Sequence, residues 1–289
     1  NSLVFVNGKL EEINLKFEKN KKFKIEKVTK IENKNIQNNA LINLNNAFTI
    51  NNYKVHVEKN YIVKKPLIIY HITNNEINST NVNIQLNFLL EENCSLKVID
   101  IYEDKSEKNF ININYNFNLK KNFILKNFKL DNANNDNIKY SFNNIEQDRN
   151  SISETFILSN GSKFIKNEIN CNLNGEYSSA FVNGIFSLDE NKHHEIKTNI
   201  NHLVENTKSY QLIKSVLDNF SKAAYQGKIY VSSDAQKTDG YQLSKAILLN
   251  ENSEFNAKPE LEIYADDVKC SHGSASGSLN ENSIFYLRS

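Results

Sequence analysis

One thiol and one imidazole lie two residues apart near the end of this 289-residue sequence, at Cys270 and His272. The residues before them, 261–268, alternate apolar and polar side chains, which predicts a strand that leads to the pair. On a strand, residues two apart point to the same face about 7 Å from each other, so both groups can contribute to one site. Imidazole and thiolate bind iron and zinc, but two ligands are too few for a closed zinc site or a stable cluster. A partner chain would have to supply the other ligands.

Other groups that could take part in chemistry have simpler interpretations. Asp266 and Asp267 are adjacent, so on a strand they face opposite sides and cannot form a carboxylate pair. At most one of them joins the face of His272, and positions in a turn or on an edge strand are expected. The dipeptide His193-His194 lies near a predicted corner, where exposed histidines are the default. A packed histidine without a ligand role is also the alternative for His272.

The composition narrows the function classes. Lys and Arg number 35 against 34 Asp and Glu, and this near-neutral balance gives no electrostatic reason to expect nucleic acid or an anionic membrane as partner. Three cysteines, Cys94, Cys171 and Cys270, are a poor disulfide framework and favour a reducing compartment. The first two lie in strand-like surroundings, where a thiol behaves as a small buried apolar group. The sequence has no bilayer-spanning apolar run, no signal-peptide pattern at its start, no glycine-rich phosphate loop and no serine-hydrolase elbow.

Sustained alternation of apolar and polar residues predicts an almost all-β chain. From residue 81 onward the apolar side chains recur at every second position, as at Val82, Ile84 and Leu86, which is typical of half-buried strands. The sequence contains only two Pro and eight Gly. The turns must therefore be formed mainly by Asn and Asp, which tolerate left-handed backbone angles.

A repeat of the form Leu-x-x-[Asn/Gly]-x-x-[Leu/Phe] indicates how the strands are arranged. Its copies begin at Leu90, Leu119, Leu158, Leu249 and Leu279, and a further copy from Leu188 ends in His194. Most neighbouring copies are about 30 residues or twice that apart, which predicts a β-solenoid when the unit is built from strands. The two apolar residues would face the core on either side of a corner, and Asn or Gly would take the strained turn position. Hairpin meanders are the alternative, but they usually need more Gly-containing turns. We therefore predict a right-handed parallel β-helix.

Several stretches resemble the SufB/SufD family of the SUF iron–sulfur cluster assembly system. They are FSKAAYQGKIYV at 220–231, DAQKTDGYQ at 234–242, and KPELEIYADDVKCSHG at 258–273 with FYLRS at the end. The resemblance covers most of the chain but is specific only over residues 220–289, with weaker support at 41–70. The stretch 236–249 lacks the cysteine of SufB, and Ser271-His272-Gly273 stands where SufB has Glu-His-Glu. The sequence is therefore more similar to the SufD branch.

The resemblance implies a parallel β-helix core over residues 41–289, with an N-terminal flanking segment over 1–40 and remnants of flanking regions at both ends. It implies a non-catalytic scaffold in the cytoplasm, or in the stroma of a plastid-bearing organism. Such a scaffold pairs with SufB and places His272, with Cys270, in a shared site where an iron–sulfur cluster forms transiently.

The family also has a C-terminal segment that docks the ATPase SufC, and a reduced flavin is linked to its complex. That segment is not present before Ser289, and no residue independently indicates a flavin. Because the sequence has no methionine, we expect it to be part of a longer protein.

Two alternatives come from other classes of protein. A β-helix carbohydrate-active enzyme, such as a polysaccharide lyase, would gather acidic and basic residues on one solenoid face and would usually carry a secretion signal. A purely structural solenoid would contain the Cys270-x-His272 spacing by chance.

Overall fold

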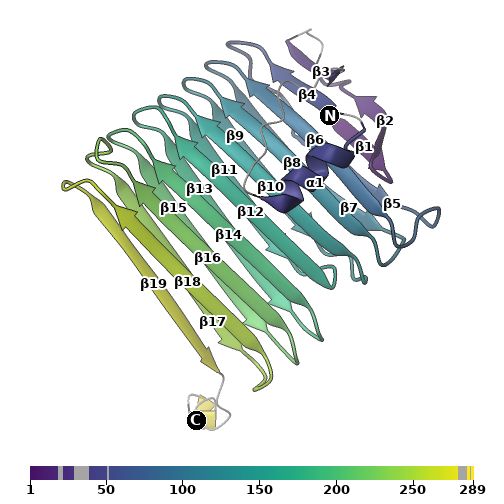
Figure 1. Ribbon diagram of the computed structural model, residues 1–289, viewed down its shortest axis with the longest axis vertical. Coiled ribbons are helices and arrows are strands. Elements are labelled where there is room, and N and C mark those ends of the chain that lie inside the picture. Colours follow the sequence, from purple (N-terminus) through teal and green to yellow (C-terminus); the bar gives the residue numbers. More distant parts are fainter. Residues whose placement is uncertain (19–21, 29–38, 51, 279–284, 287) are drawn as a thin grey trace.

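Two long β-sheets, built mainly of parallel strands, face each other and form a β-solenoid (Figure 1). The computed structural model describes residues 1–18, 22–28, 39–50, 52–278, 285–286 and 288–289. From β4 to β19 consecutive strands alternate between the sheets, and each strand pairs in parallel with the next strand but one. The predicted all-β parallel solenoid is confirmed.

We call the ten-stranded sheet "sheet A" and the nine-stranded sheet "sheet B". Sheet A consists of β1 (Ser2–Val6), β2 (Lys9–Asn14), β5 (Leu67–Thr73), β7 (Ser95–Asp104), β9 (Ile124–Asp131), β11 (Ile152–Ser159), β13 (Ser179–Leu188), β15 (Lys208–Leu217), β17 (Asp239–Leu248) and β19 (Lys269–Ser278). Sheet B consists of β3 (Phe23–Val28), β4 (Asn52–Val57), β6 (Asn81–Leu90), β8 (Phe110–Leu119), β10 (Ile138–Gln147), β12 (Phe164–Leu173), β14 (His193–His202), β16 (Lys222–Val231) and β18 (Glu254–Ile263).

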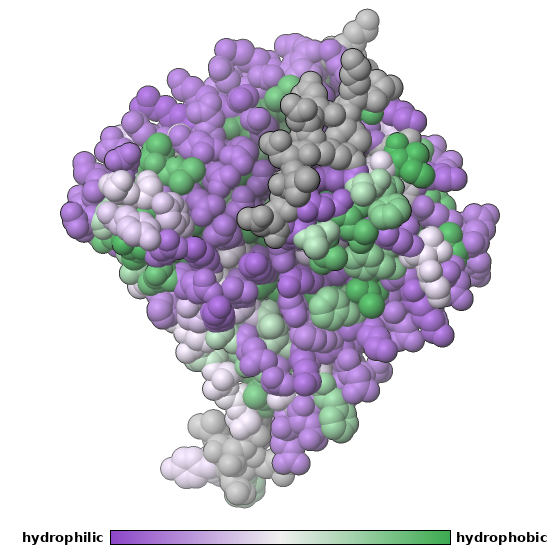
Figure 2. Space-filling model, in the orientation of Figure 1, coloured by the Kyte–Doolittle hydropathy of each residue, from purple (hydrophilic) through white to green (hydrophobic). Residues whose placement is uncertain are grey.

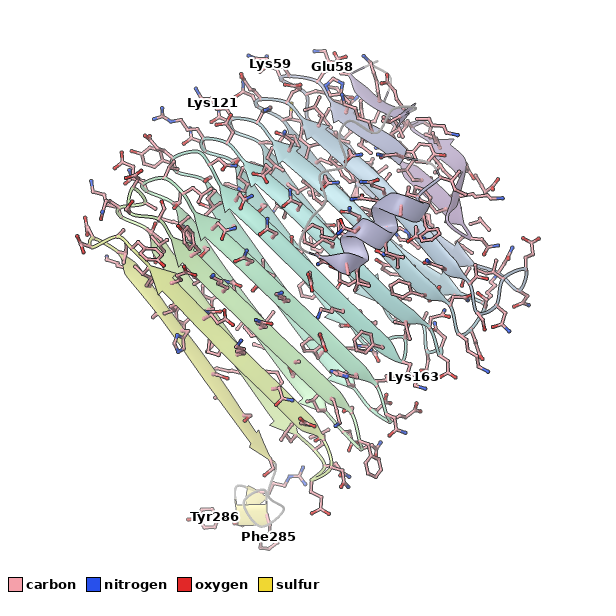
Figure 3. The ribbon with its side chains drawn as sticks, viewed as in Figure 1. Glu58, Lys59, Lys121, Lys163, Phe285 and Tyr286 are labelled. Atoms are coloured by element: carbon pink, nitrogen blue, oxygen red, sulfur yellow. The ribbon has the colours of Figure 1, made fainter. Side chains whose placement is uncertain are left out.

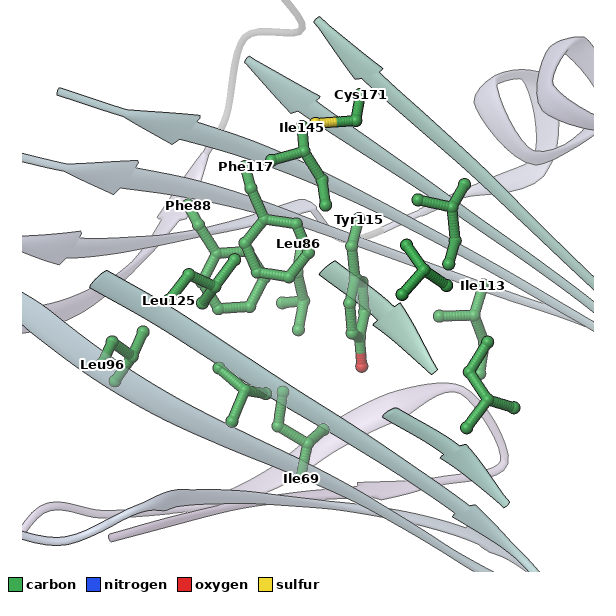
Figure 4. Close-up of a cluster of buried hydrophobic side chains, with 14 of the residues drawn as sticks. Ile69, Leu86, Phe88, Leu96, Ile113, Tyr115, Phe117, Leu125, Ile145 and Cys171 are labelled. Carbon is green, nitrogen blue, oxygen red and sulfur yellow. The ribbon is translucent and has the colours of Figure 1, made fainter. Parts of the chain in front are cut away.

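The period of two determines which side chains fill the interior. In β12 every second residue is buried, and the parallel register passes the same parity from strand to strand. The core near the N-terminal end is aromatic: Phe88 and Phe117 stack with ring centroids 4.3 Å apart, and Tyr115 packs beside them (Figure 4). Each coil therefore buries its apolar side chains against the coils before and after it.

Stacked asparagines form one corner of the solenoid. Asn60, Asn93, Asn122 and Asn150 all have positive φ, between 56° and 60°. Their side chains form a ladder in which each Nδ2 donates to Oδ1 of a neighbour, at 2.8, 2.7 and 3.0 Å. Lys59 and Lys121, which precede two of them, lie along the same edge in Figure 3. The prediction that asparagines form the turns is confirmed at this corner.

The predicted repeat is correct in its first two copies and wrong in others. Leu90, Leu96, Leu119 and Leu125 are buried next to the left-handed Asn93 and Asn122.

Leu158 and Phe164 instead face outward, and Ile157 and Ile165 fill the interior in their place. Gly161 does not have a left-handed φ; a Cβ there would lie 2.2 Å from Oδ1 of Asp131. Because side chains alternate with every residue, a shift of one residue moves a leucine from the core to the surface.

Two further copies differ as well. Leu249 is 46% exposed, and in the copy from Leu188 the left-handed residue is Glu190 rather than Asn191. The copy from Leu279 lies outside the described residues.

The two ends of the solenoid differ. At the N-terminal end β2 pairs antiparallel with β1, and β3 pairs antiparallel with β4. Helix α1 (Ala40–Phe48) begins after its N-cap Asn39 and lies on sheet B, where Ile42 packs with Tyr140 and Phe142. The division into residues 1–40 and 41–289 stays a prediction.

We expect Asn122→Ala to destabilise the solenoid by about 2 kcal/mol, because alanine is strained at positive φ and cannot form the ladder. Asn122→Gly removes only the ladder, so its loss should be about 1 kcal/mol smaller. Urea unfolding measures both, with Asn118→Ala on the exposed face of β8 as control. A glycine variant less stable than the alanine variant would contradict the strain argument.

Candidate functional site

Strands β18 and β19 form an open end of the solenoid. Each is the last strand of its sheet, and each pairs along one side only, with β16 and β17 respectively (Figure 1). Lys269 donates its backbone N–H to the carbonyl of Thr238, toward β17, at 2.8 Å. Because successive residues of a strand point their N–H groups to opposite sides, the N–H groups of Cys270, His272 and Ser276 point to the free edge.

Both predicted ligands lie on β19 and face the same side. Cys270 is in register with Gly240, and His272 with Gln242. Gly240 and Gln242 are buried on the interior side of β17, so the thiol and imidazole continue the interior into the open end. His272 is exposed, and within the described residues it forms no hydrogen bond or ion pair. Its imidazole is therefore available to a ligand or a partner chain.

The Cys270 thiol is half-buried among apolar groups. It packs with a cluster whose buried members are Ile229, Val231, Ala235 and Ala265. Burial raises the pKa of the thiol, and the backbone N–H of Gly240 opposes this effect only in part. The thiol is therefore held protonated until something stabilises the thiolate.

Asp266 and Asp267 occupy the turn between β18 and β19, which is one of the two positions expected for them. Both are exposed. The backbone N–H of Asp267 donates to Oε1 of Gln236 at 2.9 Å, and its carbonyl accepts from the N–H of Lys237 at 2.6 Å. These contacts fix the turn, and neither carboxylate is placed on the interior face with His272.

A buried polar network lies behind His272 and was not predicted from the sequence. The amide of Gln242 donates to the carbonyl of Glu260 at 3.3 Å. The Tyr225 hydroxyl lies 3.0 Å from Oε1 of Gln211 and 3.3 Å from Oε1 of Gln242. Gly227 leaves room for it, since a Cβ there would lie 2.2 Å from the Gln242 oxygen. The signal in the sequence that could have revealed this network is the presence of polar residues at strand positions that face the interior.

The two adjacent histidines have different surroundings. His193 is partly exposed, with Nε2 3.3 Å from a carboxylate oxygen of Glu195. His194 is fully buried, contrary to the expectation of an exposed residue, because it falls on the interior parity of β14. Its Nε2–H donates to the carbonyl of Ser162 at 2.7 Å, and its Nδ1 accepts from the Ser159 hydroxyl at 2.8 Å. Burial lowers its pKa to about 4.

Cys94 and Cys171 are buried, as expected. The Cys94 thiol lies 3.0 Å from the carbonyl of Glu58, and the Cys171 thiol donates to Oε1 of Gln147 at 3.0 Å. Burial raises the pKa of both thiols. Neither cysteine is part of the open end.

Charged side chains are also buried inside the N-terminal half. Asp100, fully buried, accepts from His71 at 3.0 Å and from the Tyr115 hydroxyl at 2.6 Å. Burial alone would raise the pKa of Asp100, but the ammonium of Lys129 and these two hydrogen bonds lower it below its ordinary value. The pKa of Lys129 is lowered because burial outweighs its attraction to the carboxylates. Nδ1 of His71 and Oδ2 of Asp100 are buried without a hydrogen-bond partner. Because Asp100, His71 and Lys129 are all enclosed in the interior, they form no open site.

The described residues contain no group of three or more His, Cys, Asp and Glu side chains that could hold a metal ion. A metal at Cys270 and His272 therefore needs ligands from outside the described part of this chain. No helix in the described ranges is long and apolar enough to cross a membrane.

A family model described as "SUF system FeS cluster assembly, SufBD core domain" matches residues 70–289. The chain is 29% identical over 261 residues to the iron–sulfur cluster assembly protein SufD of Escherichia coli K12. That alignment covers 88% of this chain and 61% of the bacterial protein, so the chain spans about three fifths of its length.

Two shorter alignments have higher identity. An iron–sulfur cluster assembly SufBD family protein of Synechocystis is 43% identical over 79 residues, which are 27% of this chain and 17% of that protein. The chloroplastic protein ABCI7 of Arabidopsis thaliana is 42% identical over 81 residues, which are 28% of this chain and 17% of that protein. Neither the family model nor these relatives support the carbohydrate-active alternative.

We predict that the protein loses stability in mild acid, because buried neutral histidines must then become protonated. His194 and His202 each have a pKa lowered by burial to about 4, from 6.5 in the unfolded chain. Their stabilising contribution is complete above pH 6.5 and is lost as the pH falls toward 4, on the order of 3 kcal/mol each. Urea unfolding from pH 7 to 4 should show a smaller loss for His194→Gln than for wild type. The control His193→Gln, at the partly exposed neighbouring position, should follow wild type, and an unchanged pH profile for His194→Gln would contradict the assignment.

Proposed function

The chain belongs to the SufBD core family of the SUF system, and we propose that it is a SufD-type scaffold for iron–sulfur cluster assembly. In this proposal it pairs with a SufB-type chain through its open end. His272, together with Cys270, contributes to a site that the two chains share. The single observation that carries the proposal is that the solenoid ends in two free parallel strands whose interior side displays this imidazole and thiol.

A partner with the same fold suits this end physically. The free edges of β18 and β19 present backbone donors and acceptors that another strand can pair with. The last coil also leaves interior side chains without cover: Phe255 and Leu261 are only partly buried, and Ile263 is 37% exposed. A second solenoid end would satisfy the backbone groups and cover the apolar side chains at once.

The ligand chemistry follows from the surroundings of the two groups. The cluster is the cargo of the assembly, and its iron needs a neutral imidazole or a thiolate. Because the pKa of Cys270 is raised, iron has to displace the thiol proton on binding, which couples capture to pH. The partner chain supplies the remaining ligands.

The proposal assigns the chain no catalytic step of its own. ATP hydrolysis belongs to SufC, which docks through the family's C-terminal segment. The chain would act in the cytoplasm, or in the plastid stroma for a plastid-bearing source. All three cysteines, Cys94, Cys171 and Cys270, are free thiols, which suits a reducing compartment.

The lining of one hollow on sheet B does not fit a flavin nucleotide. A polar hollow on the outer face of sheet B is lined by three carboxylates, Glu146, Glu168 and Glu260, against the two ammonium groups of Lys197 and Lys228. This balance disfavours the phosphate of a flavin nucleotide. No step of the proposal passes through a flavin.

Pairing through β19 should be blocked by Ser276→Pro. The N–H of Ser276 points to the free edge, so proline removes a donor to the partner and leaves the ladder to β17 intact. With the full-length chain and a SufB-type partner, we expect at least a tenfold weaker affinity by titration calorimetry. Ser276→Ala is the matched control and should bind as wild type, with both variants melting near wild type. Normal affinity of the proline variant would show that the partner binds elsewhere.

His272→Ala should reduce cluster formation without preventing complex assembly. The full-length chain is co-purified with its SufB and SufC partners, and iron and acid-labile sulfide are measured for wild type, His272→Ala and Cys270→Ser. We expect cluster content to fall at least fivefold for His272→Ala, because the substitution removes the exposed, unpartnered imidazole that we propose as an iron ligand. His193→Ala, which removes a partly exposed histidine outside the open end, should have no effect. Equal cluster content in wild type and His272→Ala would retain the scaffold and reject His272 as a ligand, and absence of any complex would reject the SufD-type role.

A further inference from the structure

An apolar band crosses the outer face of sheet A, on the side away from the solenoid interior. We define the outer band by six partly exposed residues: Ile99, Phe128, Phe156, Phe181, Tyr210 and Tyr241. The first three are in register on β7, β9 and β11, and the last three on β13, β15 and β17. Between β11 and β13 the band steps by two residues, because Phe156 is opposite Asn183 and Phe181 is opposite Glu154. The rings of Tyr210 and Tyr241 stack with centroids 5.3 Å apart, and those of Phe128 and Phe156 lie 6.4 Å apart.

The outer face of sheet B is different. There, Asn144, Asn170 and Asn199 are in register and are linked by two side-chain hydrogen bonds of 2.8 and 3.0 Å. Asn116, in register with Asn144, donates to Oδ1 of Asn87 at 3.0 Å. Figure 2 shows this largely hydrophilic face. Strands that are polar on their outer side need no cover, whereas strands that are apolar on both sides are typical of sheets covered on both faces. Sheet A has the second pattern.

The dimensions of the outer band fit one helix lying across the strands. The six strands from β7 to β17 span about 24 Å, which equals the length of a helix of about 16 residues. The molecule already contains this arrangement on its other face, where α1 lies across β6 and β8 and inserts Ile42 between apolar side chains (Figure 1).

The charges beside the band indicate the polar side of such a helix. On β15, Lys208 and Lys214 lie two residues before and four residues after Tyr210, and Lys245 is in register with Lys214. These three exposed lysines form no ion pair among the described residues. On sheet B the exposed lysines more often have partners, as in the Lys222–Glu254 pair at 3.0 Å.

Carboxylates on the outer face of sheet A are fewer than lysines. Glu154 is paired with Lys126 at 2.8 Å, and Glu103 and Asp239 are exposed. We propose that the outer band is a docking surface for an amphipathic helix of a partner protein, with an apolar face toward Tyr210 and carboxylates toward Lys214 and Lys245. This surface is separate from the open end and does not depend on the assignment of His272.

The test uses two fluorescein-labelled synthetic helices of 18 residues with the same leucine stripe. The acidic probe has glutamate on its polar face and the basic probe has lysine. By fluorescence polarisation at physiological salt, the acidic probe should bind the full chain at least tenfold more tightly. The double substitution Lys214→Glu and Lys245→Glu should reverse this order, and Tyr210→Ser should weaken binding of both probes. Lys197→Glu with Lys222→Glu, on the outer face of sheet B, is the matched control and should change nothing.

Three results would overturn the proposal. The first is an acidic probe that does not bind, binds no better than the basic probe, or is insensitive to Lys214 and Lys245. The second is a dimer in sedimentation that these two substitutions dissociate, which would make a second copy of the chain the occupant. The third is flotation with phosphatidylcholine vesicles containing 30% phosphatidylglycerol that depends on the same lysines, which would make the band a membrane contact.

Discussion

Each coil of this solenoid is buried only by the coils on either side of it, and the rest of the structure depends on this constraint. Interior side chains and backbone groups are satisfied along the axis of the solenoid, so its two ends need a separate solution. At the N-terminal end the antiparallel strands β2 and β3 provide it. At the other end β18 and β19 remain parallel strands with one neighbour each. The open end therefore combines free strand edges, uncovered apolar side chains and the Cys270–His272 pair, and the proposed assembly role follows from that combination.

The same constraint explains the buried charges. A polar residue on the interior parity cannot turn to solvent without breaking the register of its strand, so it stays buried even where the interior offers it no partner. Lys139 is held between Asp104 and Asp131 at 2.6 and 2.8 Å. Both amide atoms of Asn127 are buried without a partner. Such groups are expensive to bury, and their presence does not argue for stability.

Much of the fold follows from local patterns in the sequence. Period-two alternation predicts the strands, and scarcity of Gly and Pro beside abundant Asn predicts the left-handed asparagine corner at Asn93 and Asn122. The repeat fails at Leu158 because a one-residue shift reverses every side chain, and corner spacing alone does not determine that shift. The common face of Cys270 and His272 was predictable from their spacing. The burial of His194 and the network behind His272 were not, since they depend on which strands become neighbours across the interior.

We propose above all that a partner chain completes this molecule at its C-terminal end. Hydrogen–deuterium exchange of the full-length chain, alone and with a SufB-type chain, tests it most directly. We predict that exchange slows in β18 and β19, the two edge strands at the C-terminal end, and that exchange in the middle of the solenoid, as in β11 and β12, is unchanged. Slower exchange only in strands outside the open end, with β18 and β19 exchanging as fast as in the free chain, would contradict it.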